Sequence, residues 1–364
     1  MEEGEVESFS VPQVSSESGT LLEHCRRAIA RAITMGDHGL PLMGSGDWND
    51  GMNRVGVHGK GESVWLAWFL ICVLHDFSDL LETQGETAEA RGCRVLAQKV
   101  TKSIEDEAWD GAWYRRAYDD NGVPLGSSEN EEARIDSLPQ SWAAIAGVAN
   151  SERVAQALQA VNEQLVCEEE KMVLLFTPPF EYSQRDVGYI QAYPPGVREN
   201  GGQYTHAAVW VALAFARRGD GDRAVQLLQM LSPAEHARDA GWVQRYKTEP
   251  YAVAADIYTL EGRKGRGGWT WYTGASGWIY RVWLEAVFGF RLMNGKQLSF
   301  DPALPKSWPE VRLRYRYRAT EYEIVIENPR QTGHGVTRLE LDGTPVPVIS
   351  LTDDRQPHTV RVIL

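Results

Sequence analysis

Hydrophobic residues recur along most of this chain at the 3.6-residue period of helices that bury one face. The period predicts nine helices, over residues 20–35, 62–82, 85–105, 138–148, 151–163, 203–218, 221–230, 250–258 and 275–290. Glycine- and proline-rich stretches that are too long for simple turns separate several of them, at 36–61, 109–137, 176–202, 232–249 and 261–274. Long loops in a compact domain are usually functional, so the pattern favours an α/α toroid whose loops form a pocket at one end.

After about Asn294 the hydrophobic period changes from 3.6 to two. The segment VRLRYRYRATEYEIVIENP alternates between apolar and polar residues and breaks at Arg318-Ala319-Thr320, which predicts a β-hairpin. Two further alternating segments, with Asp342-Gly343 as a turn, complete a small antiparallel β-sandwich. We therefore expect a mainly α chain in three parts: a mobile tail at 1–19, a helical domain at 20–294 and a β-sandwich at 295–364.

Composition narrows the possible functions. The formal net charge is −13 over 364 residues, and Lys and Arg form no cluster of the size that a phosphate backbone needs, so no nucleic-acid partner is expected. The four cysteines lie far apart and the eight histidines show no ligand spacing, which argues against a metal site or a disulfide framework. The sequence also lacks the signatures of serine hydrolases, P-loop kinases and HExxH metalloenzymes.

The chain shows no targeting or membrane signal. Its first residues, MEEGEVESFS, are acidic and lack the apolar segment of a signal peptide. The longest apolar run, from Val64 to Leu74, is shorter than the roughly 20 residues of a bilayer span, so we interpret it as a core helix. A cytoplasmic location without direct membrane contact is expected for this chain, and anchoring of a full-length parent protein in the inner membrane stays open.

The chain contains thirteen tryptophans, and many of them stand beside Gly, Asp or Asn. Aromatic faces next to polar groups are suited to stacking on sugar rings. Tryptophans in a large helical core are the alternative, and composition leaves both interpretations open.

The most informative segment is GLPLMGSGDWNDGMNRVGVHGKGESVWLAWF at 39–69, with three carboxylates and seven glycines between two predicted helices. Glycines let the backbone approach a ligand closely. Asp47 and Asp50 could also be ordinary turn and helix-cap residues. As a whole, GSGDWNDGMNRVG followed by GKGESVWLAWF resembles the signature of glycoside hydrolase family 94. This family contains cellobiose and chitobiose phosphorylases and the C-terminal domain of cyclic β-1,2-glucan synthases, and the resemblance to the synthase domain is the strongest.

The resemblance implies a reaction. Family members cleave a β-glucoside with inorganic phosphate, and inversion at the anomeric carbon gives α-glucose 1-phosphate. The motif implies that Asp50 is the general acid and that Trp48 and Asp47 bind the glucosyl unit. Arg54, four residues after Asp50, could contact a phosphate oxygen, because a planar guanidinium suits phosphate. A surface salt bridge is the other role open to Arg54. Phosphate is itself the nucleophile, so we expect no protein base and no cofactor, with phosphate as co-substrate.

A second block, YPPGVRENGGQYTHAAVW at 193–210, leads from glycines into a predicted helix. The resemblance assigns Glu199 and Gln203 to substrate binding and His206 to phosphate. A helix that starts after glycines offers backbone donors to an anion. An internally bonded core histidine is the alternative for His206.

Two further segments match the family, and a third is of interest for its own residues. In GGWTWYTGASGWIYRVW the resemblance assigns Thr273 and Gly274 to phosphate, although the threonine could simply cap a helix. In RYKTEPYAVAADIY it assigns Glu249 to the sugar or its acceptor, with an acid in the first turn of a helix as the alternative. In RIDSLPQSW we expect Asp136 to reach the substrate.

The resemblance also concerns the extent of the domain. Family members carry an N-terminal β-sandwich, a linker and the first helices of a twelve-helix (α/α)6 barrel before the DWND loop. We therefore expect an incomplete (α/α)6 toroid in an N-terminally truncated fragment. The expected partners are a β-glucan or β-glucoside and phosphate, together with either the missing N-terminal half or a second copy in a homodimer.

Two other functions remain open at this point. One is an inverting β-glucan hydrolase in which Glu199 or Glu249 activates water. The other is a catalytically silent module that binds glucan or controls chain length within a synthase. Dependence of turnover on phosphate distinguishes a phosphorylase from a hydrolase, and loss of turnover without Asp50 distinguishes both from a silent module.

Overall fold

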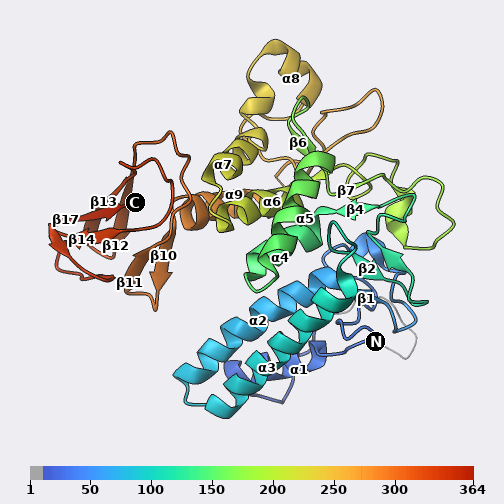
Figure 1. Ribbon diagram of the computed structural model, residues 1–364, viewed down its shortest axis with the longest axis horizontal. Helices are drawn as coiled ribbons and strands as arrows, with labels where there is room; N and C mark the ends of the chain where they lie inside the picture. Colours follow the sequence, from blue (N-terminus) through green and yellow to red (C-terminus); the bar gives the residue numbers. More distant parts are fainter. Residues whose placement is uncertain (1–10, 272) are drawn as a thin grey trace.

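The computed structural model describes residues 11–271 and 273–364. Within these ranges a helical part precedes a set of strands at the C-terminal end, and Figure 1 shows the two parts side by side. The helices are α1 (Leu21–Ala32), α2 (Val64–Thr83), α3 (Thr87–Ser103), α4 (Ser137–Ala146), α5 (Ser151–Gln164), α6 (Thr205–Arg217), α7 (Gly221–Met230), α8 (Ala240–Tyr246) and α9 (Ala275–Arg281). The mainly α class is confirmed, while closure of a toroid stays a prediction.

The predicted tail at 1–19 falls partly on residues 1–10, which lie outside the described residues. Residues 11–20 contain neither helix nor strand. Helix α1 begins directly afterwards, because the Thr20 hydroxyl accepts a hydrogen bond from the Glu23 amide at 3.1 Å. The expected division of the chain into three parts stays a prediction.

Helices α2, α4 and α6 form the centre of the helical part. Helix α4 packs against both α2 and α6. Helix α6 is buried along most of its length, as expected of a helix that is apolar on nearly all sides. Short connections lead from each central helix into α3, α5 and α7, which cover the core formed by the central three.

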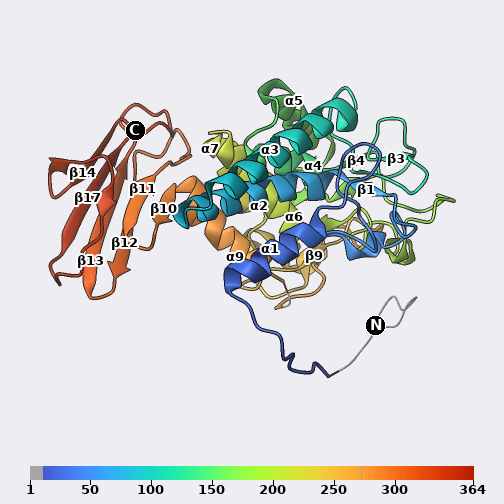
Figure 2. The same cartoon turned by 90° about the horizontal axis from the view of Figure 1, so that it is seen from below.

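Each central helix is preceded by a two-residue strand, which pairs with another short strand within a loop. Strand β1 precedes α2, β4 precedes α4 and β8 precedes α6. The pairs are β1 (Glu62–Ser63) with β2 (Ala117–Tyr118), β2 with β3 (Pro124–Leu125), β4 (Ile135–Asp136) with β7 (Phe176–Thr177), β8 (Gln203–Tyr204) with β9 (Asp256–Ile257), and β5 (Val166–Cys167) with β6 (Met172–Val173). Figure 2 shows β1 and β4 at the end of the helical part that faces away from the C-terminal strands. The long loops therefore gather where the central helices begin.

Helix α2 confirms the helix predicted at 62–82 and continues past the apolar run Val64–Leu74 to Thr83. Among the described residues it is the one helix long and apolar enough to cross a membrane, with a mean hydropathy of 1.6 over its most apolar window. More than half of that window, 56%, is buried inside the protein. A core helix meets the same criterion, and α2 packs against α3 and α4.

The prediction of a helix at 250–258 is wrong. Residues Asp256–Ile257 form strand β9, and Ala254 pairs with Thr270 of the following loop. The apolar side chains of this segment pack in a small separate core with Met172 and Tyr246. A short apolar run is compatible with either a helix or a strand. Here the segment forms a strand because its backbone pairs with β8, which is distant in the sequence.

The stretch 232–249, predicted as a loop, contains helix α8. The Asp239 carboxylate starts this helix by accepting hydrogen bonds from the amides of Gly241 and Trp242 at 3.0 and 3.1 Å. The remaining predicted helices are confirmed within a few residues, and the last one continues from α9 as a π-helix at Val282–Val287.

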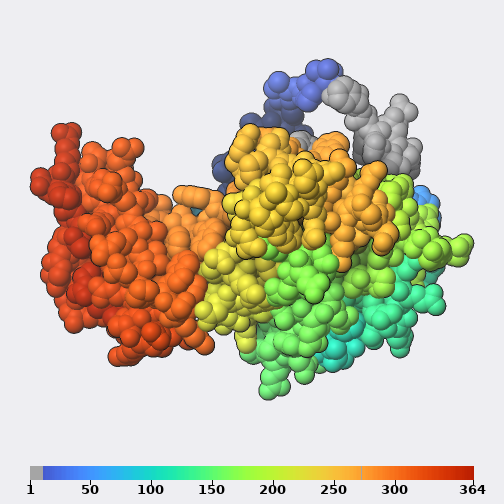
Figure 3. Space-filling model, turned by 90° about the horizontal axis from the view of Figure 1, so that it is seen from above, coloured from blue at the N-terminus to red at the C-terminus, as the bar shows by residue number. Residues whose placement is uncertain are grey.

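The C-terminal strands form two sheets, visible as a separate lobe in the space-filling view (Figure 3). One sheet has the order β10 (Phe290–Met293), β11 (Gln297–Phe300), β16 (Ile349–Ser350), and the other has the order β12 (Glu310–Tyr317), β13 (Thr320–Glu327), β17 (His358–Ile363), β14 (Arg338–Leu341), β15 (Thr344–Pro345). The predicted hairpin at 318–320 and the turn at 342–343 are confirmed. The prediction of a wholly antiparallel arrangement is wrong, since β13 and β17 are parallel. Parallel neighbours need a long crossover, which residues 328–357 supply.

Candidate active site

The carboxylate of Asp47 holds the DWND loop, residues 47–50, in place. This side chain is fully buried and accepts two hydrogen bonds from the Arg116 guanidinium, at 2.6 and 2.7 Å. It also accepts hydrogen bonds from the Ser63 hydroxyl at 2.6 Å and from the Asn49 amide at 2.9 Å. Burial alone would raise the pKa of Asp47, but Arg116 and the hydrogen bonds outweigh it and lower the pKa. Asp47 therefore fixes the loop to the start of α2.

Arg116 connects this carboxylate to a second one. Its Nε atom lies 3.3 Å from the Asp136 carboxylate, and both side chains are almost completely buried. Asp136 caps α4 by accepting the Leu138 amide at 2.7 Å. Burial raises the pKa of Asp136 to about 6, although Arg116 acts in the opposite direction. Asp47 and Asp136 thus lie on either side of Arg116 inside the protein, and their direct contact with substrate stays a prediction.

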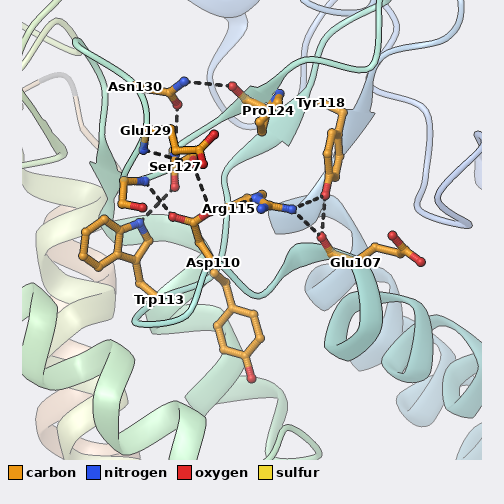
Figure 4. Close-up of polar contacts among 12 residues, drawn as sticks. Glu107, Asp110, Trp113, Arg115, Tyr118, Pro124, Ser127, Glu129 and Asn130 are labelled. Carbon is orange, nitrogen blue, oxygen red and sulfur yellow. Dashed lines mark hydrogen bonds and ion pairs between the residues drawn. The ribbon is translucent and has the colours of Figure 1, made fainter.

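A polar network fixes the hairpin that carries Arg116 (Figure 4). The preceding residue, Arg115, donates to the Asp110 carboxylate at 3.0 Å and to the Tyr118 hydroxyl at 2.9 Å. Asp110 also accepts a hydrogen bond from the Ser127 hydroxyl at 2.9 Å, which ties the two arms of the hairpin together. The guanidinium of Arg116 is consequently held on a rigid support.

Asp50, unlike Asp47, is exposed. It begins a short 3-10 helix, η1 (Asp50–Met52), which Asn49 caps by accepting the Gly51 amide at 3.1 Å. A second 3-10 helix, η3 (Tyr189–Ala192), packs against η1. The Tyr189 hydroxyl donates a hydrogen bond to the Asp50 carboxylate, and burial together with this charge raises the pKa of Tyr189.

Glu199 lies near Asp50. Its side chain is largely buried, and burial, reinforced by the charge of Asp50, raises its pKa. Arg198 opposes this effect with its Nε atom 3.3 Å from the carboxylate, and the Tyr204 hydroxyl is hydrogen-bonded to Glu199. Two carboxylates of different exposure therefore lie close enough for their charges to interact.

The side chain of Arg198 lies between aromatic rings. Its guanidinium lies 5.0 Å from the ring centre of Tyr193 and 5.6 Å from that of Trp269. The Arg198 amide donates to the Asp256 carboxylate at 3.2 Å, and burial raises the pKa of Asp256 to about 6. Arg198 is thus the cation nearest to the Glu199 carboxylate among the ion pairs of the described residues.

Trp48 and His206 meet although 158 positions separate them in the chain. The Trp48 Nε1–H donates to His206 Nδ1 at 3.0 Å. Burial lowers the pKa of His206 to about 4, so the ring is neutral at pH 7 and carries its proton on Nε2. Within the described residues this buried Nε2 has no hydrogen-bond partner. It is available as a donor to a ligand oxygen.

The other predicted site residues have different surroundings. Arg54 forms an exposed salt bridge with Asp186 at 3.0 Å, and Gln203 is buried between the Val173 amide and the Thr205 hydroxyl at 2.9 and 3.1 Å. Thr273 and Gly274 precede α9, where the threonine hydroxyl accepts the Ala275 amide at 3.1 Å. The Glu249 carboxylate accepts a hydrogen bond from Trp271 Nε1 at 3.4 Å.

The structure thus brings Trp48, Asp50, Glu199 and His206 together, with α9 next to them because the Trp278 ring lies 6.1 Å from His206. Arg54 and Gln203 are engaged elsewhere in the protein. No group of three or more His, Cys, Asp or Glu side chains within residues 11–271 and 273–364 is arranged to hold a metal ion.

Sequence reasoning missed four residues of this region, namely Arg116, Tyr189, Arg198 and Asp256. Arg198 stands beside Glu199 within a block that was singled out, so its charge was a usable signal. Arg116 and Tyr189 lie 69 and 139 positions from their carboxylate partners Asp47 and Asp50, and no local motif marks them.

Comparison with protein families agrees with this arrangement. Residues 1–289 match the family described as the glycosyl hydrolase 94 superfamily, catalytic domain. The chain belongs to this family. Residues 290–348 match a second family, the C-terminal domain of glycosyl hydrolase family 65, which corresponds to the first C-terminal strands.

Relatives in the glycosyl hydrolase 94 family confirm the resemblance expected from the motifs. The chain is 46% identical to the cyclic beta-(1,2)-glucan synthase NdvB of Rhizobium meliloti over 93% of its own length and 12% of that protein. It is 31% identical to solabiose phosphorylase of Paenibacillus borealis, over 97% of the chain and 46% of that enzyme. With N,N'-diacetylchitobiose phosphorylase of Vibrio proteolyticus it shares 30% identity, over 95% and 43%. The chain therefore spans less than half of each of these relatives.

Among solved structures, a protein titled "Sialidase" resembles the chain with a TM-score of 0.57 at 12% sequence identity. The match covers 81% of this chain and 26% of that one. At this identity the similarity concerns the fold alone.

Proposed function

We propose that the chain is the catalytic region of an inverting glycoside phosphorylase that releases α-glucose 1-phosphate from β-linked glucosides, with β-1,2-linked glucan as its substrate. The observation that carries the proposal is the exposed Asp50 carboxylate opposite the buried Glu199, beside Trp48 and His206. Membership of a family whose relatives are named phosphorylases supports the reaction type. The name of the glucan synthase relative supports the linkage.

In the proposed reaction a phosphate oxygen attacks the anomeric carbon while the bond from that carbon to the leaving oxygen breaks. Asp50 donates its proton to the leaving oxygen, so the second sugar departs as a neutral alcohol. The C–O–P linkage forms on the opposite face of the ring, which inverts its configuration. Trp48 and Glu199 hold the glucosyl unit, Trp48 by its ring and Glu199 by accepting hydroxyl protons.

Phosphate binding rests on neutral donors in this proposal. The buried Nε2–H of His206 and the backbone at Thr273 and Gly274 donate hydrogen bonds to phosphate oxygens. A neutral His206 avoids the cost of burying an additional charge. Arg54 contacts phosphate only if its exposed salt bridge with Asp186 opens, and breaking an exposed salt bridge costs little free energy.

We further propose that the helical part is completed to an (α/α)6 toroid. Either the N-terminal half expected from the family or a second copy in a homodimer supplies the missing helices. Asp47 and Asp136 are both buried and both paired with Arg116, so their role in this proposal is structural. Their contribution is to keep the DWND loop in place for the substrate. We place the reaction in the cytoplasm, where phosphate is the co-substrate and no further cofactor is required.

The decisive test replaces Asp50 by Asn in the full-length protein that contains this chain. Without a proton donor, phosphorolysis should fall by at least roughly 100-fold. The measurement is release of glucose 1-phosphate from a linear β-1,2-glucan. Asp79→Asn, an exposed carboxylate on α2, is the control and should leave the rate unchanged. Full activity of Asp50→Asn would refute the assignment.

The alternative reaction, hydrolysis, requires a protein side chain that activates water. It needs Glu199 or Glu249 as a base, and the Glu199 carboxylate is already paired with Arg198. Glu249 is bonded to Trp271. We therefore expect turnover to cease in phosphate-free buffer and to return when phosphate is added, whereas continued release of glucose without phosphate would favour the hydrolase.

A further inference from the structure

Three aromatic side chains lie exposed on the loops after α8. Tyr251 and Trp271 each have 74% of their surface accessible to solvent, and Trp269 has 60%. The rings of Tyr251 and Trp271 lie 6.1 Å apart at an angle of 61°. A single exposed aromatic residue needs no explanation, but a group of large rings at one place indicates a binding surface.

The loops that carry these rings are held in place by backbone pairing. The amide of Ala255 donates to the carbonyl of Trp269 at 2.6 Å, and Ala254 pairs with Thr270. The small core around Tyr246 lies beneath this ribbon. Such support keeps the exposed rings in a defined position, which lowers the entropy cost of binding a ligand.

Polar groups accompany the rings. The Trp271 indole N–H donates to the Glu249 carboxylate at 3.4 Å, so a hydrogen-bond acceptor lies at the edge of the exposed pair. Although Tyr251 and Trp271 contact each other edge to face, most of each side chain stays accessible to solvent. Ring faces with a carboxylate alongside match a sugar, whose C–H bonds stack on the rings and whose hydroxyls donate to the carboxylate.

The aromatic group is continuous with the candidate active site. The Arg198 guanidinium lies 5.6 Å from the ring centre of Trp269, and the same side chain pairs with Glu199 at 3.3 Å. The strand that carries Asp256 pairs with the segment that leads to Trp269. In the space-filling view the segment around residues 240–270 forms one continuous surface (Figure 3).

We propose that Tyr251 and Trp271, with Glu249, form a binding site for a β-linked glucan chain outside the position where the bond is cleaved. This inference rests on the proposed function, because that function defines where cleavage occurs. The site engages sugar units beyond those next to Asp50, so it favours a chain over a disaccharide. An uncharged polysaccharide also suits a protein whose net charge is −13.

Calorimetric titration of the 364-residue chain with linear β-1,2-glucans of increasing length tests the site. Tyr251→Ala and Trp271→Ala should each weaken binding of long chains by roughly tenfold and leave binding of the disaccharide nearly unchanged. Trp271→Phe, which keeps a ring, should retain most of the affinity. Tyr182→Ala is the matched control, since Tyr182 is 77% exposed on another loop. Circular dichroism verifies that each variant is folded.

Each outcome has a distinct meaning. Equal affinity of the wild type and both alanine variants for long glucans would overturn the site. So would variants that bind glucan normally but lose association with the remainder of the full-length protein, because the rings would then be a protein interface. Failure of the proposed function is seen separately, as absence of glucose 1-phosphate release by the full-length protein while glucan binding still depends on Trp271.

Discussion

At the scale of single residues, the two aspartates of the DWND motif have opposite environments. Asp47 is buried and paired with Arg116, whereas Asp50 is exposed and bonded to Tyr189. A nearby guanidinium stabilises the ionised form of a buried carboxylate and therefore opposes its protonation. An exposed carboxylate without such a partner can exchange protons with a substrate. The family resemblance assigned the acid role to Asp50, but only the structure reveals this difference in burial between two chemically identical residues.

Arg116 is the residue whose loss should cost the most stability. Arg116→Met leaves the Asp47 and Asp136 carboxylates buried without their partner, so the free energy of unfolding should fall by about 3–5 kcal/mol. Arg54→Met is the control, because its salt bridge with Asp186 is exposed and should contribute less than about 1 kcal/mol. Denaturant unfolding measures both. Equal losses in the two variants would contradict the buried ion-pair arrangement.

His206 should make stability depend on pH. Burial lowers its pKa from 6.5 to about 4, so between these values the unfolded chain binds a proton that the folded protein does not. Acidification through this window therefore favours unfolding. His206→Asn removes the titration and keeps an acceptor for Trp48, so the Tm advantage of the wild type over the variant should shrink as the pH falls from 6.5 to 4. A difference in Tm that stays constant would contradict a buried neutral His206.

At the scale of elements, the site depends on contact between two short 3-10 helices. Gly188 precedes η3 and has a φ of +120°, and a Cβ atom there would lie 2.6 Å from the carbonyl oxygen of Gly51. Glycine is required at this position both by conformation and by the close approach of η1. The contact between η1 and η3 keeps Tyr189 beside Asp50.

Gly188→Ala should therefore push η3 away from η1 and misplace the acid. A displacement of about 1 Å can cost roughly 100-fold in rate, and we expect a loss of that order in kcat/KM for phosphorolysis. Gly85→Ala is the matched control, because Gly85 has a φ of +82° but open space around its Cβ position. It should lose some stability through strain but no activity. Equal activity of both variants would show that the η1–η3 contact does not position Asp50.

At the scale of the whole molecule, strands β1 and β4, which precede α2 and α4, lie at one end of the helical part and the C-terminal sheets at the other (Figure 2). The chain spans 46% of solabiose phosphorylase and 43% of diacetylchitobiose phosphorylase. The loop before α2 supplies Asp50, while the loop before α6 and the first turn of that helix supply Glu199 and His206. Further residues around the glucosyl unit are expected from the remainder of the protein.

This arrangement predicts that binding and turnover separate in the chain by itself. We expect the 364-residue chain to bind linear glucan while releasing glucose 1-phosphate at least tenfold more slowly than the full-length protein, because part of the substrate's binding energy is absent. Adding the remaining part as a separate polypeptide should restore activity. Full activity of the chain alone would contradict the expectation that the toroid must be completed.

The sequence predicted what depends on neighbours along the chain. Helix positions follow from apolar periodicity, the hairpin at Arg318–Thr320 from alternation, and the acid candidate Asp50 from a motif of contiguous residues. These signals are local, since each is contained within a few turns of helix or one pair of strands. The segment 250–258 shows the limit, because its short apolar run fits both periods.

Only the tertiary structure decided which polar groups meet. It paired Asp47 with Arg116 and Trp48 with His206, turned Arg54 toward Asp186 and buried Gln203. The physical reason is that burial cost and charge pairing depend on distances in space, which sequence separation does not determine. The same reason explains why family and fold class could be inferred from the sequence, while the surroundings of each site residue could not.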